Sequence, residues 1–173
     1  MKKIYKKIII AGFPGVGKST AAEKFPKFFI DAESSDFHWI KTESGEKTVN
    51  PEWPENYVNF IRMIALNNEE KYKDTVYVCC STHKEVLSRL LELDTEFVCV
   101  LPGTKAETIK RYKARGNSPE FIESLSKNWM AYKKDITETD MPVINLHGEY
   151  LADYLTRPTA YIELFDMLNE YND

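Results

Sequence analysis

The sequence predicts an α/β fold of three layers, in which helices cover both faces of a five-stranded parallel sheet. Short apolar runs alternate with segments of helical periodicity along the 173 residues, which is the pattern of parallel strands joined by crossover helices. A glycine-rich turn separates the first apolar run from the first helical segment. A chain of this length is enough for one such domain, so we expect a single domain over 1–173.

Five apolar runs are the expected strands. They span about 6–11, 27–31, 75–80, 96–101 and 142–146. The helix after the glycine-rich turn must be short, because Pro26 ends it. The polar, proline-containing stretch 38–53 has no clear periodicity, and we expect an irregular, mobile insert there.

Capping patterns mark several helix boundaries. Thr82-x-x-Glu85 and Thr104-x-x-Glu107 have the spacing of capping boxes, and Ser118-Pro119 suits the start of another helix. The inward sides of the last two long helices are expected to carry these apolar residues: Phe121, Ile122, Leu125, Trp129 and Tyr132, then Ile162, Phe165 and Leu168.

The charge and cysteine content restrict the class of protein. A net charge of −4 gives no electrostatic reason for tight, sequence-independent binding to nucleic acid. Cys79, Cys80 and Cys99 lie inside apolar runs, as buried free thiols in a reducing compartment would. No apolar run is long enough to span a bilayer. We therefore expect a cytoplasmic monomer or homodimer that acts on a small molecule.

The glycine-rich turn has the spacing of a phosphate-binding loop. Residues 12–19 match the pattern GxxxxGK[ST] between a strand and a helix. Backbone N–H groups of such a loop turn inward around phosphates, and the next helix presents its positive end. The pattern predicts a nucleoside triphosphate bound by Gly12, Phe13, Pro14, Gly15, Val16, Gly17, Lys18, Ser19 and Thr20. Lys18 would reach the β- and γ-phosphates, and Ser19 would ligate Mg²⁺.

Acidic residues follow the second predicted strand. Asp31, Glu33 and Asp36 would lie at the carboxyl edge of the sheet, where ligands of open α/β folds bind. A carboxylate there could hold Mg²⁺ or take a proton from an acceptor hydroxyl. An Asx turn followed by a solvated acidic loop is the alternative.

Two arginines follow the fourth predicted strand at helical spacing. Arg111 and Arg115 are four residues apart, so they share one helix face. On a closing segment they would stabilise the charge of a transferring phosphoryl group. A solvated basic face that includes Lys110 and Lys113 is the alternative.

The third predicted strand lacks the aspartate that usually supports Mg²⁺ at its end. Ser81 stands there, followed by His83 and Lys84, which could meet an acceptor. Asp31 is then the candidate second metal ligand, and helix capping is the alternative role of Ser81 and Thr82.

These segments together resemble the small phosphoryl-transfer kinases of the phosphate-loop NTPase superfamily. The segments are GFPGVGKST, the acidic end of the second strand, CCSTHKEVL, FVCVLPG and RYKARGN. The group includes nucleoside monophosphate, shikimate and gluconate kinases, and DAESSDF, NPEWPENYVNFI and RGNSPEFIESLSKNW resemble kinase-like proteins often encoded by bacteriophages. The resemblance implies the strand order 2-3-1-4-5, an acceptor-side insert at about 38–70 and a lid at about 103–120.

The resemblance implies ATP and Mg²⁺ as cofactors and a nucleoside monophosphate or nucleoside as acceptor. It assigns nucleotide binding to the loop, a closing role to Arg111 and Arg115, and the acceptor side to Asp31, Glu33, Asp36 and Arg62. Adenine would lie at the loop 145–150. No Asn/Thr-Lys-x-Asp guanine motif is present, which favours ATP over GTP.

Other functions remain open at this point. The chain could phosphorylate a sugar acid or another metabolite, or a phosphorylated acceptor could bind Arg62, Lys84 and Arg89. A nucleotide-dependent switch with slow hydrolysis would act through order and disorder of 38–53. An end-processing kinase for nucleic acids is disfavoured by the acidic charge balance.

Overall fold

The centre of the computed structural model, which describes residues 7–67 and 69–171, is a five-stranded parallel sheet. In sheet order the strands are β2 (Phe29–Asp31), β5 (Tyr77–Cys80), β1 (Ile8–Gly12), β6 (Phe97–Leu101) and β7 (Val143–Asn145). Counted among themselves along the chain, these five strands have the order 2-3-1-4-5 that was expected. Position 6, where the first strand was expected to begin, lies outside the described residues.

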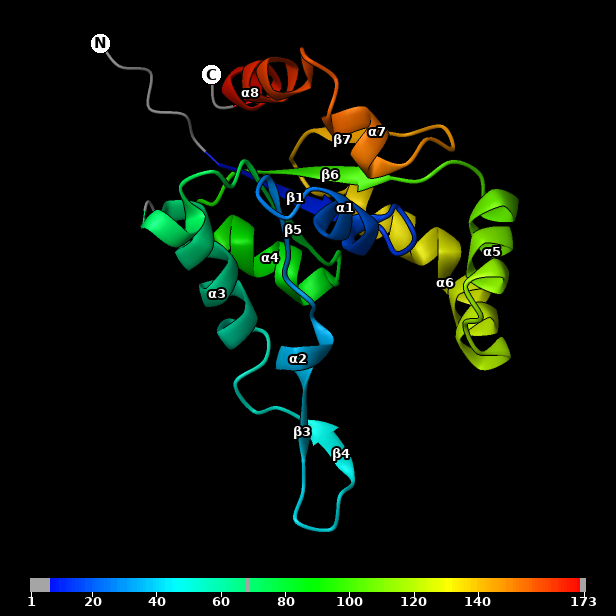
Figure 1. Ribbon diagram of the computed structural model, residues 1–173. Helices are drawn as coiled ribbons and strands as arrows, with labels where there is room; N and C mark the ends of the chain where they lie inside the picture. The colour runs from blue at the N-terminus through cyan, green and yellow to red at the C-terminus, as the bar shows by residue number, and fades with distance from the viewer. Residues whose placement is uncertain (1–6, 68, 172–173) are drawn as a thin grey trace.

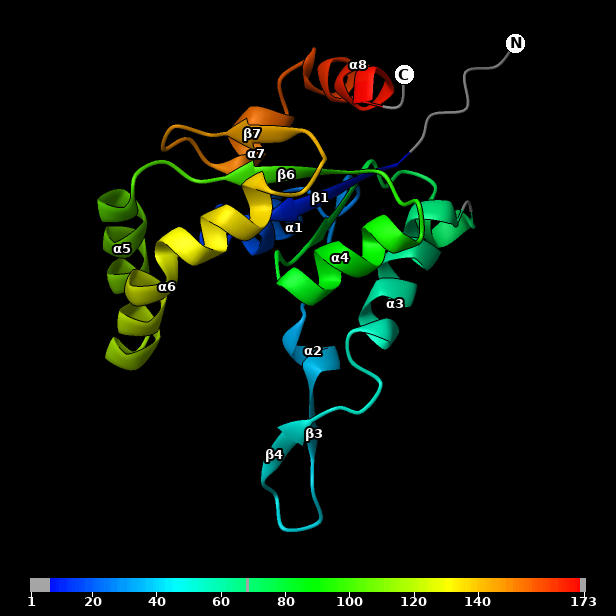
Figure 2. The ribbon, with the colours of Figure 1, turned by 180° about the vertical axis from the view of Figure 1, so that it is seen from behind.

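Helices form a layer on each side of the sheet, as Figures 1 and 2 show. One layer holds α1 (Lys18–Lys24), α7 (Leu151–Leu155) and α8 (Ala160–Tyr171). The other holds α3 (Glu55–Leu66), α4 (Lys84–Glu92) and α6 (Pro119–Thr137), and α5 (Lys105–Ala114) packs against α6 at one end. The three-layer α/β fold predicted from the sequence is confirmed.

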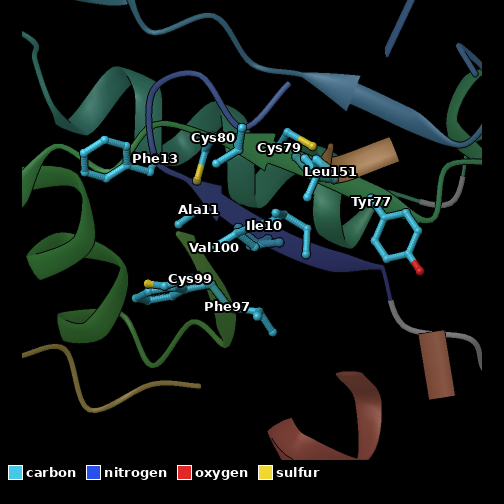
Figure 3. Packing of buried hydrophobic residues seen from close by; sticks show 14 of the residues in the cluster. Ile10, Ala11, Phe13, Tyr77, Cys79, Cys80, Phe97, Cys99, Val100 and Leu151 are labelled. Carbon is cyan, nitrogen blue, oxygen red and sulfur yellow. The ribbon is translucent and has the colours of Figure 1, made fainter. Parts of the chain in front are cut away.

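The strands of the sheet centre are buried on both faces. Every residue of β1, β5 and β6 is buried, as expected for parallel strands covered by two helix layers. Figure 3 shows Ile10, Cys79 and Val100 from these strands within one apolar cluster. Cys79, Cys80 and Cys99 are free thiols, and burial raises the pKa of Cys99 to about 11, so it is protonated at neutral pH.

The segment 38–53 is more ordered than the sequence indicated. It contains an antiparallel hairpin of β3 (Trp39–Lys41) and β4 (Lys47–Val49), preceded by α2 (Ser35–His38). The hairpin projects from the body of the molecule in Figure 1. All six of its strand residues are exposed, so it lacks the apolar alternation by which a half-buried strand is recognised. A short 3₁₀ helix, η1 (Glu70–Tyr72), follows α3 later in the chain.

One of the two predicted capping boxes forms. Thr104 accepts from the backbone N–H of Glu107, whose side chain reaches back to the N–H of Thr104. Thr82 does not cap α4, because the chain stays extended through His83, which is the N-cap residue.

The docking faces of the two C-terminal long helices differ partly from those expected. In α8 the buried residues are Ala160, Leu164 and Leu168, whereas Ile162 is 60% exposed. In α6 they are Leu125, Trp129 and Ile136, whereas Phe121 and Tyr132 are exposed. None of the helices in the described ranges is long and apolar enough to cross a membrane.

Candidate functional site

The phosphate loop joins β1 to α1 and depends on glycines at three positions. Gly15 and Gly17 have φ angles of 87° and 98°, in the left-handed region that side chains disfavour. A Cβ at Gly12 would lie 2.8 Å from Cγ2 of Val16. The glycine spacing in the sequence therefore corresponds to backbone conformations that this loop requires.

Buried side chains fix the loop to the protein body. Phe13 and Val16 are fully buried, and the backbone N–H of Phe13 donates to the carbonyl of Val100 at 2.9 Å. The Phe13 ring packs edge-on against Trp129, with ring centroids 4.9 Å apart. Phe13 and Val16 are among the nine residues expected to bind the nucleotide. Because their side chains are buried, only their backbone groups could contact it.

A cavity of about 480 Å³ opens over this loop at the carboxyl edge of the sheet. Its volume lies in the usual range for small-molecule sites. The lining residues come from the loop and α1, the end of β2, the segment after β5, and α5 and α6. Among them are Lys18, Ser19, Asp31, Glu33, Ser81, His83, Tyr112 and Arg115.

Ser19 and Asp31 connect the loop to the end of β2. The hydroxyl of Ser19 donates to Oδ2 of Asp31 at 2.8 Å, while the buried Oδ1 of Asp31 has no partner. Burial raises the pKa of Asp31, and the hydrogen bond from Ser19 and the charge of Lys18 oppose this effect. A half-paired carboxylate beside a phosphate loop is a suitable ligand for a divalent cation.

Tyr112 of α5 carries a second unpaired oxygen. Its side chain is 3% exposed, and its hydroxyl has no hydrogen-bond partner. The hydroxyl lies so close to Gly15 that a Cβ added there would be 2.9 Å away. Within residues 7–67 and 69–171, Asp31 and Tyr112 hold the two buried side-chain oxygens or nitrogens without a partner. Both residues line this one cavity.

Lys18 is folded over its own loop. Its ammonium group donates to the carbonyl of Gly12 at 2.7 Å. The side chain thus lies along the loop at the cavity.

The two arginines predicted to share one helix face, Arg111 and Arg115, face different surroundings. Arg115, the C-cap residue of α5, lines the cavity. Arg111 instead donates to the carbonyl of Gly148 and stacks over the ring of Tyr150, 4.0 Å from its centroid. The structure therefore does not bring the pair together over the phosphate loop, and it places Arg111 at the loop 145–150.

The end of β5 is tied to the end of β2 by Tyr57 of α3. The buried hydroxyl of Tyr57 donates to the carbonyl of Ala32 at 2.5 Å and accepts from the N–H of Ser81 at 3.0 Å. The hydroxyl of Ser81 lies 2.8 Å from Nδ1 of His83. Burial is the main cause that lowers the pKa of His83.

The expected acceptor residues are only partly brought together. Glu33, Ser81 and His83 line the cavity with Asp31, whereas Asp36 and Arg62 do not. Asp36 lies exposed on α2, and Arg62 is on α3, where its charge acts on Glu55.

Sequence reasoning missed two features of the site. Tyr112 received no role, although it stands between the two arginines on the same helix. His38 gave no clear signal, yet its ring stacks between Trp39 and Trp53, with centroids 4.5 Å from each. His83 then packs edge-on against Trp53. The contacts of His38 and His83 join residues from distant parts of the chain, which one sequence does not reveal.

Comparison with known proteins gives similarity of structure alone. No protein-family model matches the chain, and no curated protein matches it. A gluconokinase from Sinorhizobium meliloti 1021 is 17% identical, with a TM-score of 0.45 over 99% of this chain and 94% of that one. A shikimate kinase from Bacteroides thetaiotaomicron is 17% identical, with a TM-score of 0.45 over 95% of this chain and 96% of that one.

A third similar structure is the SH3-kinase fragment of tight junction protein 3. It is 16% identical, with a TM-score of 0.44, and the match covers 96% of this chain and 57% of the fragment. Likenesses at this level indicate no substrate. The function of this chain must therefore be inferred from its own residues.

Proposed function

We propose that this protein is an ATP-dependent phosphotransferase that phosphorylates a hydroxyl group of a small molecule. The observation that carries the proposal is the pair of unpaired buried oxygens, Oδ1 of Asp31 and the hydroxyl of Tyr112. An unpaired buried polar atom costs about 1–3 kcal/mol, so such atoms are rare without a reason. Both residues line the cavity over the phosphate loop, where a bound nucleotide and cation would supply partners.

Ser19 and Asp31 are suited to hold Mg²⁺. Mg²⁺ commonly takes one or two protein oxygens and completes its shell with substrate phosphates and water. No group of three His, Cys, Asp or Glu side chains in the described part of the chain could hold a metal ion, so its other ligands would come from the nucleotide. When bound, the cation would offset negative charge on the phosphates.

The placement of the side chains supports the following transfer step. The acceptor hydroxyl oxygen forms a bond to the γ-phosphorus of ATP, the bond from that phosphorus to the β,γ-bridging oxygen breaks, and ADP leaves. The hydroxyl proton passes to a carboxylate at the end of β2, Asp31 or Glu33. Lys18 and Arg115 stabilise the charge on the phosphates.

Two segments would close the site. The lid-like segment 103–120 includes α5, which carries Tyr112 and ends at Arg115, and the insert 38–70 lies on the acceptor side. Their closure would exclude water, so that phosphate passes to the acceptor and not to hydrolysis. Arg111, stacked on Tyr150, would adjoin the adenine.

A nucleotide-dependent switch is the competing function. The hairpin β3–β4 and the stacked rings of His38 and Trp53 argue against a segment that orders only with nucleotide. Arg115 supplies a cation at the cavity from the chain itself, so catalysis would not need a partner's arginine.

A transfer assay with separated products tests the proposal. The protein is incubated with Mg²⁺ and with ATP labelled at the γ-phosphate. Nucleosides, nucleotides, sugars or sugar acids are added as acceptors in separate reactions. We expect a labelled, acceptor-dependent product that disappears in Lys18→Ala. Labelled inorganic phosphate as the sole product with every acceptor would favour the switch.

A further inference from the structure

The cations and the carboxylates that line the cavity come from different elements, although Lys18 is near enough to Asp31 for its charge to act on that carboxylate. Lys18 belongs to the phosphate loop, and Arg115 ends α5, whose Tyr112 packs on that loop. Asp31 and Glu33 lie at and just after the end of β2. Bound phosphates would therefore engage both cations. The acceptor would meet the carboxylates.

The other residues on the acceptor side are polar and carry no positive charge. Ser34, Ser81 and Thr82 present hydroxyl groups at the cavity. His83 is held 2.8 Å from the hydroxyl of Ser81, and desolvation by neighbouring groups lowers its pKa, which disfavours a positive charge there. This set can exchange hydrogen bonds with hydroxyl or amine groups.

Basic residues on neighbouring elements lie outside the cavity lining or contact carboxylates of other segments. Arg89 of α4 makes two hydrogen bonds to Glu55, at 2.7 and 3.2 Å, and a third to Glu92. Arg62 does not line the cavity. Lys84 is 74% exposed and lies 4.0 Å from Asp135. None of these three residues is placed to bind an anionic group of the acceptor.

We infer that the acceptor carries no phosphate or carboxylate group and is an uncharged or cationic hydroxyl compound, such as a nucleoside, a sugar or an aminosugar. The inference rests on the proposed function and names the substrate class of that site. Mg²⁺ held by Asp31 would be shared with the nucleotide phosphates, so a phosphate or carboxylate of the acceptor beside Glu33 would be repelled without a further cation. A nucleoside monophosphate or a sugar acid is thus disfavoured as substrate.

Matched acceptor pairs test the inference. Each pair differs in one anionic group and keeps its other hydroxyl groups: a nucleoside and its 3′-monophosphate, and a sugar and the sugar acid with a carboxylate in place of one CH₂OH group. Transfer is measured as kcat/KM, and binding is measured by calorimetry in the presence of Mg²⁺ and ADP. In at least one pair, the member without the anion should exceed its partner by about tenfold or more in both measurements. Equal or better use of the anionic members would overturn the inference.

A charge reversal provides a second measurement. Glu33→Lys should shift the preference within a pair toward the anionic member by about tenfold or more. Glu43→Lys, in the exposed turn of the β3–β4 hairpin, introduces the same charge away from the cavity and should leave the preference unchanged. An equal shift in both variants would contradict a local effect at the end of β2.

Different results would overturn the inferred substrate class and the proposed phosphotransferase function. Wild-type transfer to an anionic acceptor, with little transfer to its uncharged partner, overturns this inference and leaves the phosphotransferase function intact. Absence of transfer and of calorimetric binding for every acceptor overturns both.

Discussion

The hydroxyl of Ser19 donates a hydrogen bond of 2.8 Å to Oδ2 of Asp31 and so links the phosphate loop to the end of β2. The two residues are twelve positions apart in sequence, and parallel pairing of β2 and β1 with β5 brings their strand ends to one edge. The other oxygen of Asp31 is buried and unpaired. In the proposed function, these two side chains supply a pair of oxygens for a cation, and the unpaired oxygen destabilises the free protein.

Asp31→Asn should separate stability from function. Burial raises the pKa of Asp31, so the folded chain binds its proton more tightly than the unfolded chain does. Protonation of Asp31 therefore raises the unfolding free energy of wild type as the pH falls through the folded-state pKa. This stabilisation is absent at neutral pH. Asn keeps an oxygen for Ser19 and carries no charge, so the free variant should be at least as stable as wild type at pH 7.

The same variant should weaken the effect of Mg²⁺ on ATP binding by about tenfold or more. Thermal unfolding with and without Mg²⁺ and ATP measures both properties, and Glu43→Gln is the control at an exposed carboxylate away from the cavity. A large loss of stability in free Asp31→Asn would contradict the assignment.

Tyr112→Phe should weaken nucleotide binding without destabilising the fold. The substitution removes a buried hydroxyl that has no partner in the free protein, so the unfolding free energy should stay equal or rise. If the nucleotide supplies the partner, the affinity for ATP should fall about fivefold or more. Calorimetric titration with ATP and urea unfolding measure the two effects. Unchanged affinity would show that the hydroxyl does not contact the nucleotide.

Gly15→Ala should be more damaging than Gly45→Ala. Both glycines have positive φ angles, 87° and 84°, so each variant is expected to cost about 1–2 kcal/mol from backbone strain. At Gly15 the new Cβ would also lie 2.9 Å from the hydroxyl of Tyr112, whereas nothing lies within 4 Å at Gly45. We expect about 1–3 kcal/mol more for Gly15→Ala. Urea unfolding measures the difference. Equal losses of unfolding free energy in the two variants would mean that α5 shifts at no cost to relieve the contact.

Arg115→Ala and Arg111→Ala should affect different kinetic constants. Arg115 lines the cavity, so its loss should lower kcat about a hundredfold or more with little change in ATP affinity. Arg111 contacts Gly148 and Tyr150, so its loss should mainly raise the KM for ATP. Steady-state kinetics with the identified acceptor separates the two. Equal losses of kcat and ATP affinity in Arg115→Ala would indicate a role in binding alone.

The two Thr-x-x-Glu patterns should differ in their contribution to stability. Thr104→Ala removes an observed capping box and should cost about 1 kcal/mol. Thr82 caps nothing, so Thr82→Ala should change the unfolding free energy by less than about 0.5 kcal/mol. Urea unfolding of both variants tests the comparison.

Local patterns in the sequence predict most of the fold. The apolar runs mark all five strands of the sheet, and most clearly β1, β5 and β6, because strands buried on both faces are apolar throughout. The hairpin β3–β4 was missed because its residues are exposed and carry no apolar alternation. In α8, Ile162 was wrongly assigned to the core, since an apolar residue near the start of a helix does not establish which face docks.

The candidate site was predictable where one motif defines it. The phosphate loop follows from its spacing, and Asp31 follows from its place at the end of a strand. The unpaired hydroxyl of Tyr112 and the partners of Arg62 and Arg89 depend on how helices pack around the sheet. Packing of that kind joins distant segments, and periodicity within one segment does not report it.

Phosphate transfer from γ-labelled ATP to a mixed panel of unphosphorylated and phosphorylated acceptors, in wild type and in Lys18→Ala, tests the central claim most directly. The account predicts a labelled product that depends on Mg²⁺ and on the acceptor and that is absent in Lys18→Ala. Saturable binding of ATP with no labelled acceptor from any member of the panel would contradict it.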